Sequence, residues 1–296
     1  MIFFSLDLML KLIFAGILAG FASSTMGVFV VRLKMTSIGY CMAHAAFAGA
    51  ALGMLIDNYL ILASINLNIN LPLIMAFLFT FLTSILLGPL SEKTKLDVNV
   101  ILGFLFALML ALGFIFLSFL PSGVISSQAV SVLWGSIFGV MIEDLIALAV
   151  ISALIIVFLI FFYKEFLSIM FNKKMALASG INVSLFTFII LLFNGLVITF
   201  SINIIGALLV YALIVNPAST SFQFFYDMKK IFIFAAIIGI ADSVAGIFMS
   251  LFFDLPVGSS IIIVSCIVFI SAVIISPKRR WKMKKQKGID EWNNTN

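Results

Sequence analysis

Residues 27–55 read GVFVVRLKMTSIGYCMAHAAFAGAALGML, and this stretch decides how the rest of the chain is interpreted. It contains the chain's single histidine, His44, one of its two cysteines, Cys41, and the basic residues Arg32 and Lys34 between two apolar runs. Ionisable side chains are rare inside membrane spans because an unpaired charge there is costly. Their concentration in one stretch predicts a functional site within a membrane.

The composition of the whole chain is that of an integral membrane protein. Of the 296 residues, 64% are hydrophobic and only 10% are charged, which is far from the soluble average. Both cysteines lie in apolar runs, so no disulfide framework is predicted. No cleavable signal peptide is recognised at the N-terminus. We expect an all-α, polytopic bundle over residues 1–277 and a basic cytoplasmic tail over residues 278–296.

Nine apolar segments are long enough to cross a hydrocarbon core of ~30 Å. With the N-terminus outside, the inner loops and the tail contain 16 of the 17 lysines and arginines, as the positive-inside rule requires. The exception, Lys11, lies where it can reach the interface. This distribution explains the basic charge without a nucleic-acid partner. The predicted spans are 8–30, 37–56, 71–90, 97–119, 141–163, 183–200, 202–218, 231–252 and 257–276.

Three further sequence features bear on how the helices pack. Residues 120–140 are too polar at their start for a span and too apolar at their end for a loop, which predicts an interfacial or re-entrant element. The break between spans six and seven is expected near residues 201–203. Pairs of glycines four residues apart allow two helix backbones to approach closely. These pairs are Gly16 and Gly20, Gly49 and Gly53, and Gly135 and Gly139.

His44 is the strongest candidate for a metal ligand. Tyr40 and Cys41 precede it by four and three residues, so on a helix the phenol, thiol and imidazole share one face. Imidazole and thiolate suit ions such as Zn²⁺. The alternative is a neutral, hydrogen-bonded core histidine, because one histidine and one cysteine form an incomplete coordination shell.

Two other polar positions lie in the later spans. Asp242 is either a partner in a helix–helix hydrogen bond or a carboxylate that lines a polar path. The Asn216-Pro217 step removes one backbone hydrogen bond within its helix. Such breaks line cavities in transporters and also occur as plain kinks.

The sequence contains none of the common catalytic motifs. A P-loop is absent, as are the patterns H-E-x-x-H, C-x-x-C and G-x-S-x-G, so the chain is not expected to be an enzyme or to bind ATP by a P-loop of its own. The longest predicted inner loop, residues 164–182, is too short for a catalytic domain. Transport, channel and scaffold functions remain.

Four segments, in colinear order, resemble the membrane permeases of zinc, manganese and iron(II) ABC importers. The resemblance implies a homodimeric permease in the cell membrane, a separate cytoplasmic ATPase and an extracytoplasmic metal-binding protein. It implies a transported divalent metal ion and no covalently bound cofactor. The segments are MGVFVVRLKMTSIGYCMAHAAFAGAALG (26–53), WGSIFG (134–139) with EDL (143–145), IGALLVYALIVNPAST (205–220) and DLPVGS (254–259).

The resemblance also implies roles for particular residues. It places the metal path at His44 and a coupling element for the ATPase in the inner loop, with Ala176, Ala178 and Gly180 facing that subunit. One position departs from the family pattern, which has aspartate where this chain has Tyr40. Asp242 could replace the missing charge, and Cys41 could shift the preference towards softer ions.

Two functions of other classes remain open. One is a carrier or channel driven by an ion gradient, with Asp242 and His44 as a proton relay. The other is a membrane scaffold that retained the fold and lost the site, to which Tyr40 lends support.

Overall fold

The computed structural model describes residues 6–62, 69–94, 96–121, 141–206 and 210–278. Within these ranges all regular structure is helical, which confirms the all-α class. The helices are α1 (Leu6–Arg32), α2 (Ser37–Leu62), α3 (Leu71–Thr94), α4 (Val98–Ser118), α7 (Ile142–Phe161), α8 (Tyr163–Phe171), α9 (Lys173–Ala178), α10 (Val183–Ile205), α11 (Val210–Phe224), α12 (Met228–Phe253) and α13 (Val257–Ile275).

Seven of these helices are long and apolar enough to cross a membrane, namely α1, α2, α4, α7, α10, α12 and α13. The apolar part of α3 is shorter, Leu71–Leu87, and α11 has 15 residues. At 1.5 Å per residue, 15 residues span only ~22 Å. The polytopic class is therefore established, and the total of nine crossings stays a prediction.

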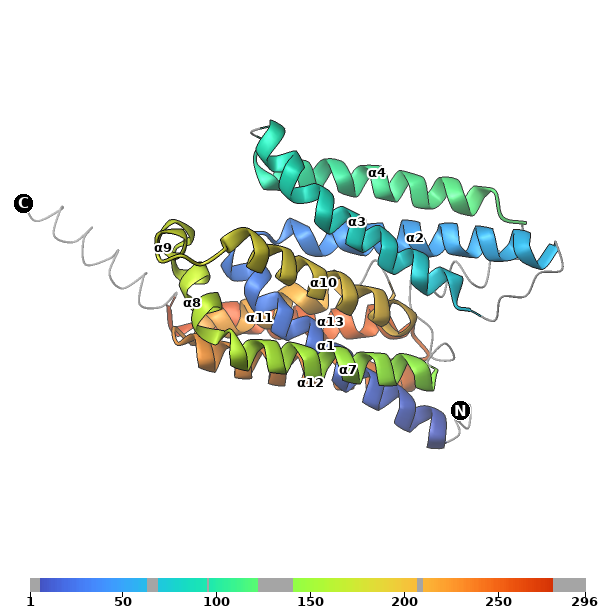
Figure 1. Cartoon of the computed structure of the whole chain (residues 1–296). Coiled ribbons are helices and arrows are strands. Elements are labelled where there is room, and N and C mark those ends of the chain that lie inside the picture. Colours follow the sequence, from blue (N-terminus) through green and yellow to red (C-terminus); the bar gives the residue numbers. More distant parts are fainter. Residues whose placement is uncertain (1–5, 63–68, 95, 122–140, 207–209, 279–296) are drawn as a thin grey trace, which may run out of the picture.

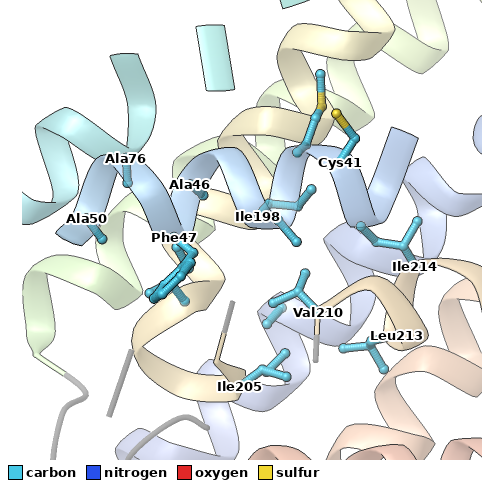
Figure 2. Packing of buried hydrophobic residues seen from close by; sticks show 14 of the residues in the cluster. Cys41, Ala46, Phe47, Ala50, Ala76, Ile198, Ile205, Val210, Leu213 and Ile214 are labelled. Carbon is cyan, nitrogen blue, oxygen red and sulfur yellow. The ribbon is translucent and has the colours of Figure 1, made fainter. Parts of the chain in front are cut away.

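The long helices run side by side in two groups (Figure 1). In one group α2 packs against α3 and α4, and in the other α1 packs against α7, α11 and α12, while α13 packs on α11 and α12. Helix α10 contacts both groups through α1 and α3. Figure 2 shows the largest apolar cluster, in which Cys41 and Phe47 of α2 meet Ile198 of α10 and Leu213 of α11.

Glycines create the closest helix contacts, as two of the predicted pairs show. A Cβ atom added to Gly20 would collide with the carbonyl oxygen of Gly239 in α12. Added to Gly49 or Gly53, it would collide with the backbone of α3. Close backbone approach requires residues without a side chain, so these pairs are packing sites. The third pair, Gly135 and Gly139, lies outside the described residues.

The predicted break near residues 201–203 was wrong. Helix α10 continues through these residues to Ile205, and Gly206 ends it with φ of +92°. This left-handed region is accessible to glycine at little cost, whereas the polar residues Ser201 and Asn203 lie within the helix. Helix α2 also runs beyond its predicted end and includes Asp57, which had been assigned to an outer loop. Most of the predicted re-entrant element, residues 122–140, lies outside the described part.

Short polar side chains define where four helices begin. Asp97, Asn172, Asn182 and Asp227 each accept a hydrogen bond from a backbone N–H in the first turn of α4, α9, α10 and α12. Such N-caps satisfy amide groups that have no partner within the helix. All four caps lie at the end of the bundle that carries α8 and α9, which Figure 1 shows opposite the start of α1.

At the same end, Lys278 joins the last described residues to the end of α11. Its ammonium donates hydrogen bonds to the carbonyl oxygens of Phe222 and Phe225 and lies 3.8 Å from the centroid of the Tyr226 ring. A lysine at a helix C-terminus satisfies carbonyl groups that lack an internal partner. Burial lowers the pKa of Lys278 below its usual value. Residues 279–296 of the predicted tail lie outside the described part.

The contact between α1 and α12 predicts a large effect of one glycine substitution. Gly20→Leu should destabilise the protein by on the order of 3 kcal/mol, because its side chain would collide with the backbone of α12. The measurement is the melting temperature of the detergent-solubilised protein, followed by size-exclusion chromatography. Gly103→Leu is the control, because nothing lies within 4 Å of a Cβ added there. Equal melting temperatures for the two variants would contradict the packing role of Gly20.

Candidate functional site

The candidate site lies in the buried first part of α2. Alanine and glycine dominate this helix from Ala43 to Gly53, and the side chains of Ala43, Ala45 and Ala48 are fully buried. Small residues allow α3 and α4 to pack closely on both sides of α2. His44 therefore lies on a helix that is in close contact with α3 and α4.

The hydrogen bond of His44 determines which ring nitrogen is available. Nδ1 lies 2.7 Å from the carbonyl oxygen of Tyr40. A carbonyl oxygen only accepts hydrogen bonds, so Nδ1 is the donor and carries the proton. In the neutral imidazole Nε2 then keeps its lone pair, the arrangement found in histidines that bind metals. The side chain is 8% exposed, so this geometry is fixed by its surroundings.

A series of aromatic ring contacts begins at His44 and continues through Phe106 and Tyr40 to Tyr211. Phe106 of α4 contacts the imidazole edge-on, with 4.5 Å between ring centroids. The half-buried Tyr40 ring contacts Phe106 at 5.1 Å and Tyr211 of α11 at 5.6 Å. Gly39 makes room for Tyr211, because a Cβ at that position would lie 2.6 Å from the tyrosine ring. The aromatic contacts of this series thus involve three helices.

The sequence did not reveal Phe106 and Tyr211 as parts of this site. Both lie in apolar helices that contain other aromatic residues, and their positions have no recognisable spacing from His44. Gly39 is the residue of α2 that makes room for the Tyr211 ring. This pairing can be recognised only once α11 is placed against α2.

Cys41 belongs to the large apolar cluster against which Tyr40 and Phe106 also pack. Its side chain is fully buried in the apolar cluster of Figure 2, near Ile198 and Ile214. In the described part of the chain, no three or more His, Cys, Asp or Glu side chains are grouped to hold a metal ion. Among the described residues, His44 is therefore not part of a group of three or more such ligands.

Asp242 lies in a different part of the bundle. Helix α12 packs against α1, α11 and α13, whereas α2 packs against α3, α4, α10 and α11. The side chain of Asp242 is 2% exposed and faces Ser265 of α13. Its Oδ2 atom has no hydrogen-bond partner among the described residues. The structure therefore does not bring Asp242 and His44 together.

Asn216 and Pro217 connect α11 to its neighbours. Pro217 is buried inside α11, and Asn216 Nδ2 donates a hydrogen bond of 3.5 Å to Cys266 Sγ of α13. One turn earlier, Gly27 of α1 contacts the carbonyl group of Ile214, where a Cβ would collide. In the described structure this step is thus a packing element between α1, α11 and α13.

The predicted coupling element forms the two short helices α8 and α9. Ala176 is fully buried against Ile169 and Val183, so its side chain faces the bundle, whereas Ala178 and Gly180 are exposed. Gly180 adopts φ of +80° directly after α9. Its N–H bonds to the Leu177 carbonyl and that of Ile181 to the Ala176 carbonyl, the Schellman arrangement that ends helices at glycine.

Aromatic contacts hold α8 firmly on the bundle. The buried ring of Phe166 contacts Phe29 of α1 at 4.8 Å, Phe158 of α7 at 5.5 Å and Phe186 of α10 at 5.4 Å. Edge-to-face aromatic pairs contribute about 0.5–1.5 kcal/mol each beyond the burial of their area. Helix α8 is thus attached to three of the long helices at once.

The outer surface of α8 and α9 is apolar. Phe171 is 79% exposed, and Met175 and Leu177 are also exposed. A groove of about 360 Å³ lies beside them, lined by Lys164, Leu167, Ser168, Phe171, Asn172 and Met175. Exposed apolar surface with a charged rim is typical of protein contact sites.

Tyr163 connects the start of α8 to the turn before α12. Lys229 lies 5.8 Å from the centroid of the Tyr163 ring. Burial, together with the negative charge of Asp227, raises the pKa of Tyr163 above its usual value. The phenol is consequently neutral at physiological pH and contributes to this contact through its ring.

Together, seven apolar spans and a buried histidine on an alanine- and glycine-rich helix define a multi-pass protein of the cell membrane. The model of the ABC 3 transport family matches residues 5–276. The chain belongs to this family, which confirms the resemblance noted in the sequence.

Known relatives match over nearly the whole chain. The manganese transport system membrane protein MntC of Listeria innocua is 26% identical over 95% of both chains. The high-affinity zinc uptake system membrane protein ZnuB of Buchnera aphidicola is 30% identical over 87% of this chain and 95% of its own. The fold is similar to a structure of PsaBC from Streptococcus pneumoniae in complex with Fab, with a TM-score of 0.80, 22% identity and coverage of 95% and 96%.

The tautomer of His44 can be tested directly, because this is the chain's single histidine. In protein labelled with ¹⁵N-histidine, solid-state NMR should show a protonated Nδ1 and an unprotonated Nε2. The reason is that the Tyr40 carbonyl can only accept a hydrogen bond. The variant His44→Gln should lack both signals. A protonated Nε2 with an unprotonated Nδ1 would contradict the assignment.

Proposed function

We propose that this protein is the membrane-spanning permease subunit of an ATP-driven ABC importer for a divalent transition metal ion, namely zinc, manganese or iron(II). It forms the translocation path, and a separate subunit hydrolyses ATP. Membership of the ABC 3 transport family supports this function, as do the relatives named for manganese transport and zinc uptake.

The surface of α8 and α9 carries the proposal. A membrane protein driven by a separate ATPase needs a contact that is both exposed and rigidly attached to the moving helices. Phe171, Met175 and Leu177 provide exposed apolar area, and Phe166 fixes α8 to α1, α7 and α10. A force applied to α8 is therefore transmitted to three long helices rather than absorbed in a loop.

The orientation follows from the distribution of basic residues. Nine crossings with the N-terminus outside place α8, α9 and the tail in the cytoplasm, where the ATPase binds. An extracytoplasmic metal-binding protein then delivers its ion at the opposite end of the bundle. Two copies of the chain form the transporter, with the path between them.

His44 is the residue that contacts the metal ion in this proposal. Its Nε2 lone pair is available, and its ring is positioned by the Tyr40 carbonyl. A ligand of this kind binds an ion briefly without trapping it, because a single imidazole is far short of a complete coordination shell.

One observation favours a second function, a carrier driven by an ion gradient. Asp242 is a buried carboxyl group with an unpartnered oxygen among the described residues, and intramembrane carboxyls commonly act in proton relays. Such a carrier would continue to take up its substrate after depletion of ATP. An importer with a separate ATPase would stop.

The proposed ATPase contact predicts different effects of two equally exposed phenylalanines. Phe171 is 79% exposed on α8 and Phe252 is 80% exposed on α12. Phe171→Ser should reduce co-purification of the ATPase by about tenfold or more, since central apolar residues dominate interfaces. Phe252→Ser should leave it unchanged. If both variants retained the ATPase equally, the contact would have to lie elsewhere.

Substitution of the histidine tests the metal path. In cells that express the complete transporter, His44→Gln should reduce ATP-dependent uptake of ⁶⁵Zn by about tenfold or more, because glutamine removes the ring nitrogen that binds the ion. Asp242→Asn is the matched control and should retain uptake. Uptake that survived ATP depletion, and that was lost in Asp242→Asn, would establish the carrier instead.

A further inference from the structure

A buried pair of polar side chains joins α12 to α13 near the middle of both helices. Asp242 is 2% exposed, and it faces Ser265, which is fully buried. The neighbouring turn has the same antiparallel register, because a Cβ added to Gly246 would collide with the backbone of Ile261. The position of Asp242 against α13 is therefore fixed by close helix packing.

The two facing groups have no other hydrogen-bond partners. Asp242 Oδ2 and Ser265 Oγ are both enclosed, and neither has a partner among the described residues. Ser243, the next residue of α12, is turned towards α1, where its Oγ would lie 2.6 Å from a Cβ added to Gly20. A buried polar group without a partner is costly. One hydrogen bond between Asp242 and Ser265 satisfies both groups.

No cation balances a negative charge on Asp242 in the described part of the chain. Asp242 forms no ion pair there, and Lys11 of α1 is paired with Asp7. The nearer lysine at the start of α12 lies about 18 Å away along the helix. Helices α1, α11 and α13 pack against α12, and the other titratable groups of these four helices are Asp7, Lys11, Arg32, Tyr211, Lys229, Lys230 and Cys266.

The neutral form of Asp242 fits these surroundings better than the ionised form. An ionised carboxylate only accepts hydrogen bonds, and the hydroxyl of Ser265 is the one donor that faces it among the described residues. An unpaired charge within a membrane span is costly. A protonated carboxyl group is uncharged and has a donor of its own, so a bound proton removes this cost.

We propose that Asp242 is a proton-binding site within the membrane, whose protonated carboxyl group donates a hydrogen bond to Ser265 Oγ and fastens α12 to α13. A metal ion does not fit this site, because one carboxyl and one hydroxyl group are too few ligands. The bond lies beside that from Asn216 Nδ2 to Cys266 Sγ, which joins α11 to α13. Together the two bonds connect the last three helices.

Infrared spectroscopy of the purified protein tests the bound proton. At about pH 5.5 an ordinary aspartate, with a pKa near 3.9, is ionised. Protein labelled with ¹³C at the aspartate carboxyl groups should nevertheless show the C=O band of a protonated acid. Asp242→Asn should lose this band, whereas Asp254→Asn, at the exposed end of the same helix, should retain it.

The wild-type spectrum is decisive even where a variant does not fold. Absence of a protonated aspartate band from the wild type would overturn the proposal. An unchanged band in Asp242→Asn would also overturn it, because the proton would then belong to another aspartate.

A second pair of variants tests the role of Ser265. Asparagine at position 242 is neutral, and its amide donates to Ser265 as a protonated carboxyl group does. Ser265→Ala should therefore lower the melting temperature equally in the wild type and in Asp242→Asn, by on the order of 2 °C. A much larger loss in the wild type would indicate an ionised carboxylate deprived of its donor. That result, or no loss in either background, would overturn the proposed bond.

The proton-binding site is independent of the proposed transport function. Absence of the infrared band would leave an ATP-driven importer unaffected, since neither His44 nor the surface of α8 and α9 takes part in this site. Uptake that survived ATP depletion would refute the importer and leave the proton-binding site standing.

Discussion

Direct contact between helix backbones is the constraint on which the rest of the structure depends. Inside a bilayer the apolar surface of a helix gains little by leaving lipid for protein, so association relies on close van der Waals packing. Gly20 with Gly239 in one group, and Gly49 and Gly53 against α3 in the other, provide that packing. Because these contacts fix α1 and α2, they also fix two positions on which the proposed function depends, the last turn of α1 and the buried part of α2.

These two positions are joined by the short basic turn between Arg32 and Ser37. Leu33 in this turn contacts three apolar clusters, which belong to the centre of the bundle, to the aromatic contacts of α8, and to the region around Ala176. Phe29, one turn earlier, contacts Phe166 of α8. Tyr40 and His44 follow within two turns of the start of α2. The side chain of Leu33 thus packs against the centre of the bundle as well as against the clusters that hold α8 and α9.

The sequence was a good guide to features that depend on local composition. The length of the apolar segments identified an all-α membrane protein and most of its helices, and the spacing of glycines identified two packing sites. Each of these properties is set by residues close together in the chain. The break between α10 and α11 was misplaced because the apolar run is nearly continuous there, whereas backbone conformation at Gly206 determined the end of the helix. Phe106, Tyr211 and the inward orientation of Ala176 could not be found, since they depend on how separate helices meet.

His44 and Asp242, two of the buried ionisable groups, differ in their hydrogen-bond partners. His44 is held by a hydrogen bond to its own helix and by aromatic rings, so its cost of burial is that of a neutral imidazole. Asp242 faces a serine and has an oxygen without a partner among the described residues. A neutral ring retains a lone pair that can bind a cation, whereas a buried carboxylate without partners requires a proton or a cation to offset its charge. The two buried groups therefore differ in the ligand that each provides, a neutral nitrogen on α2 and a carboxyl oxygen between α12 and α13.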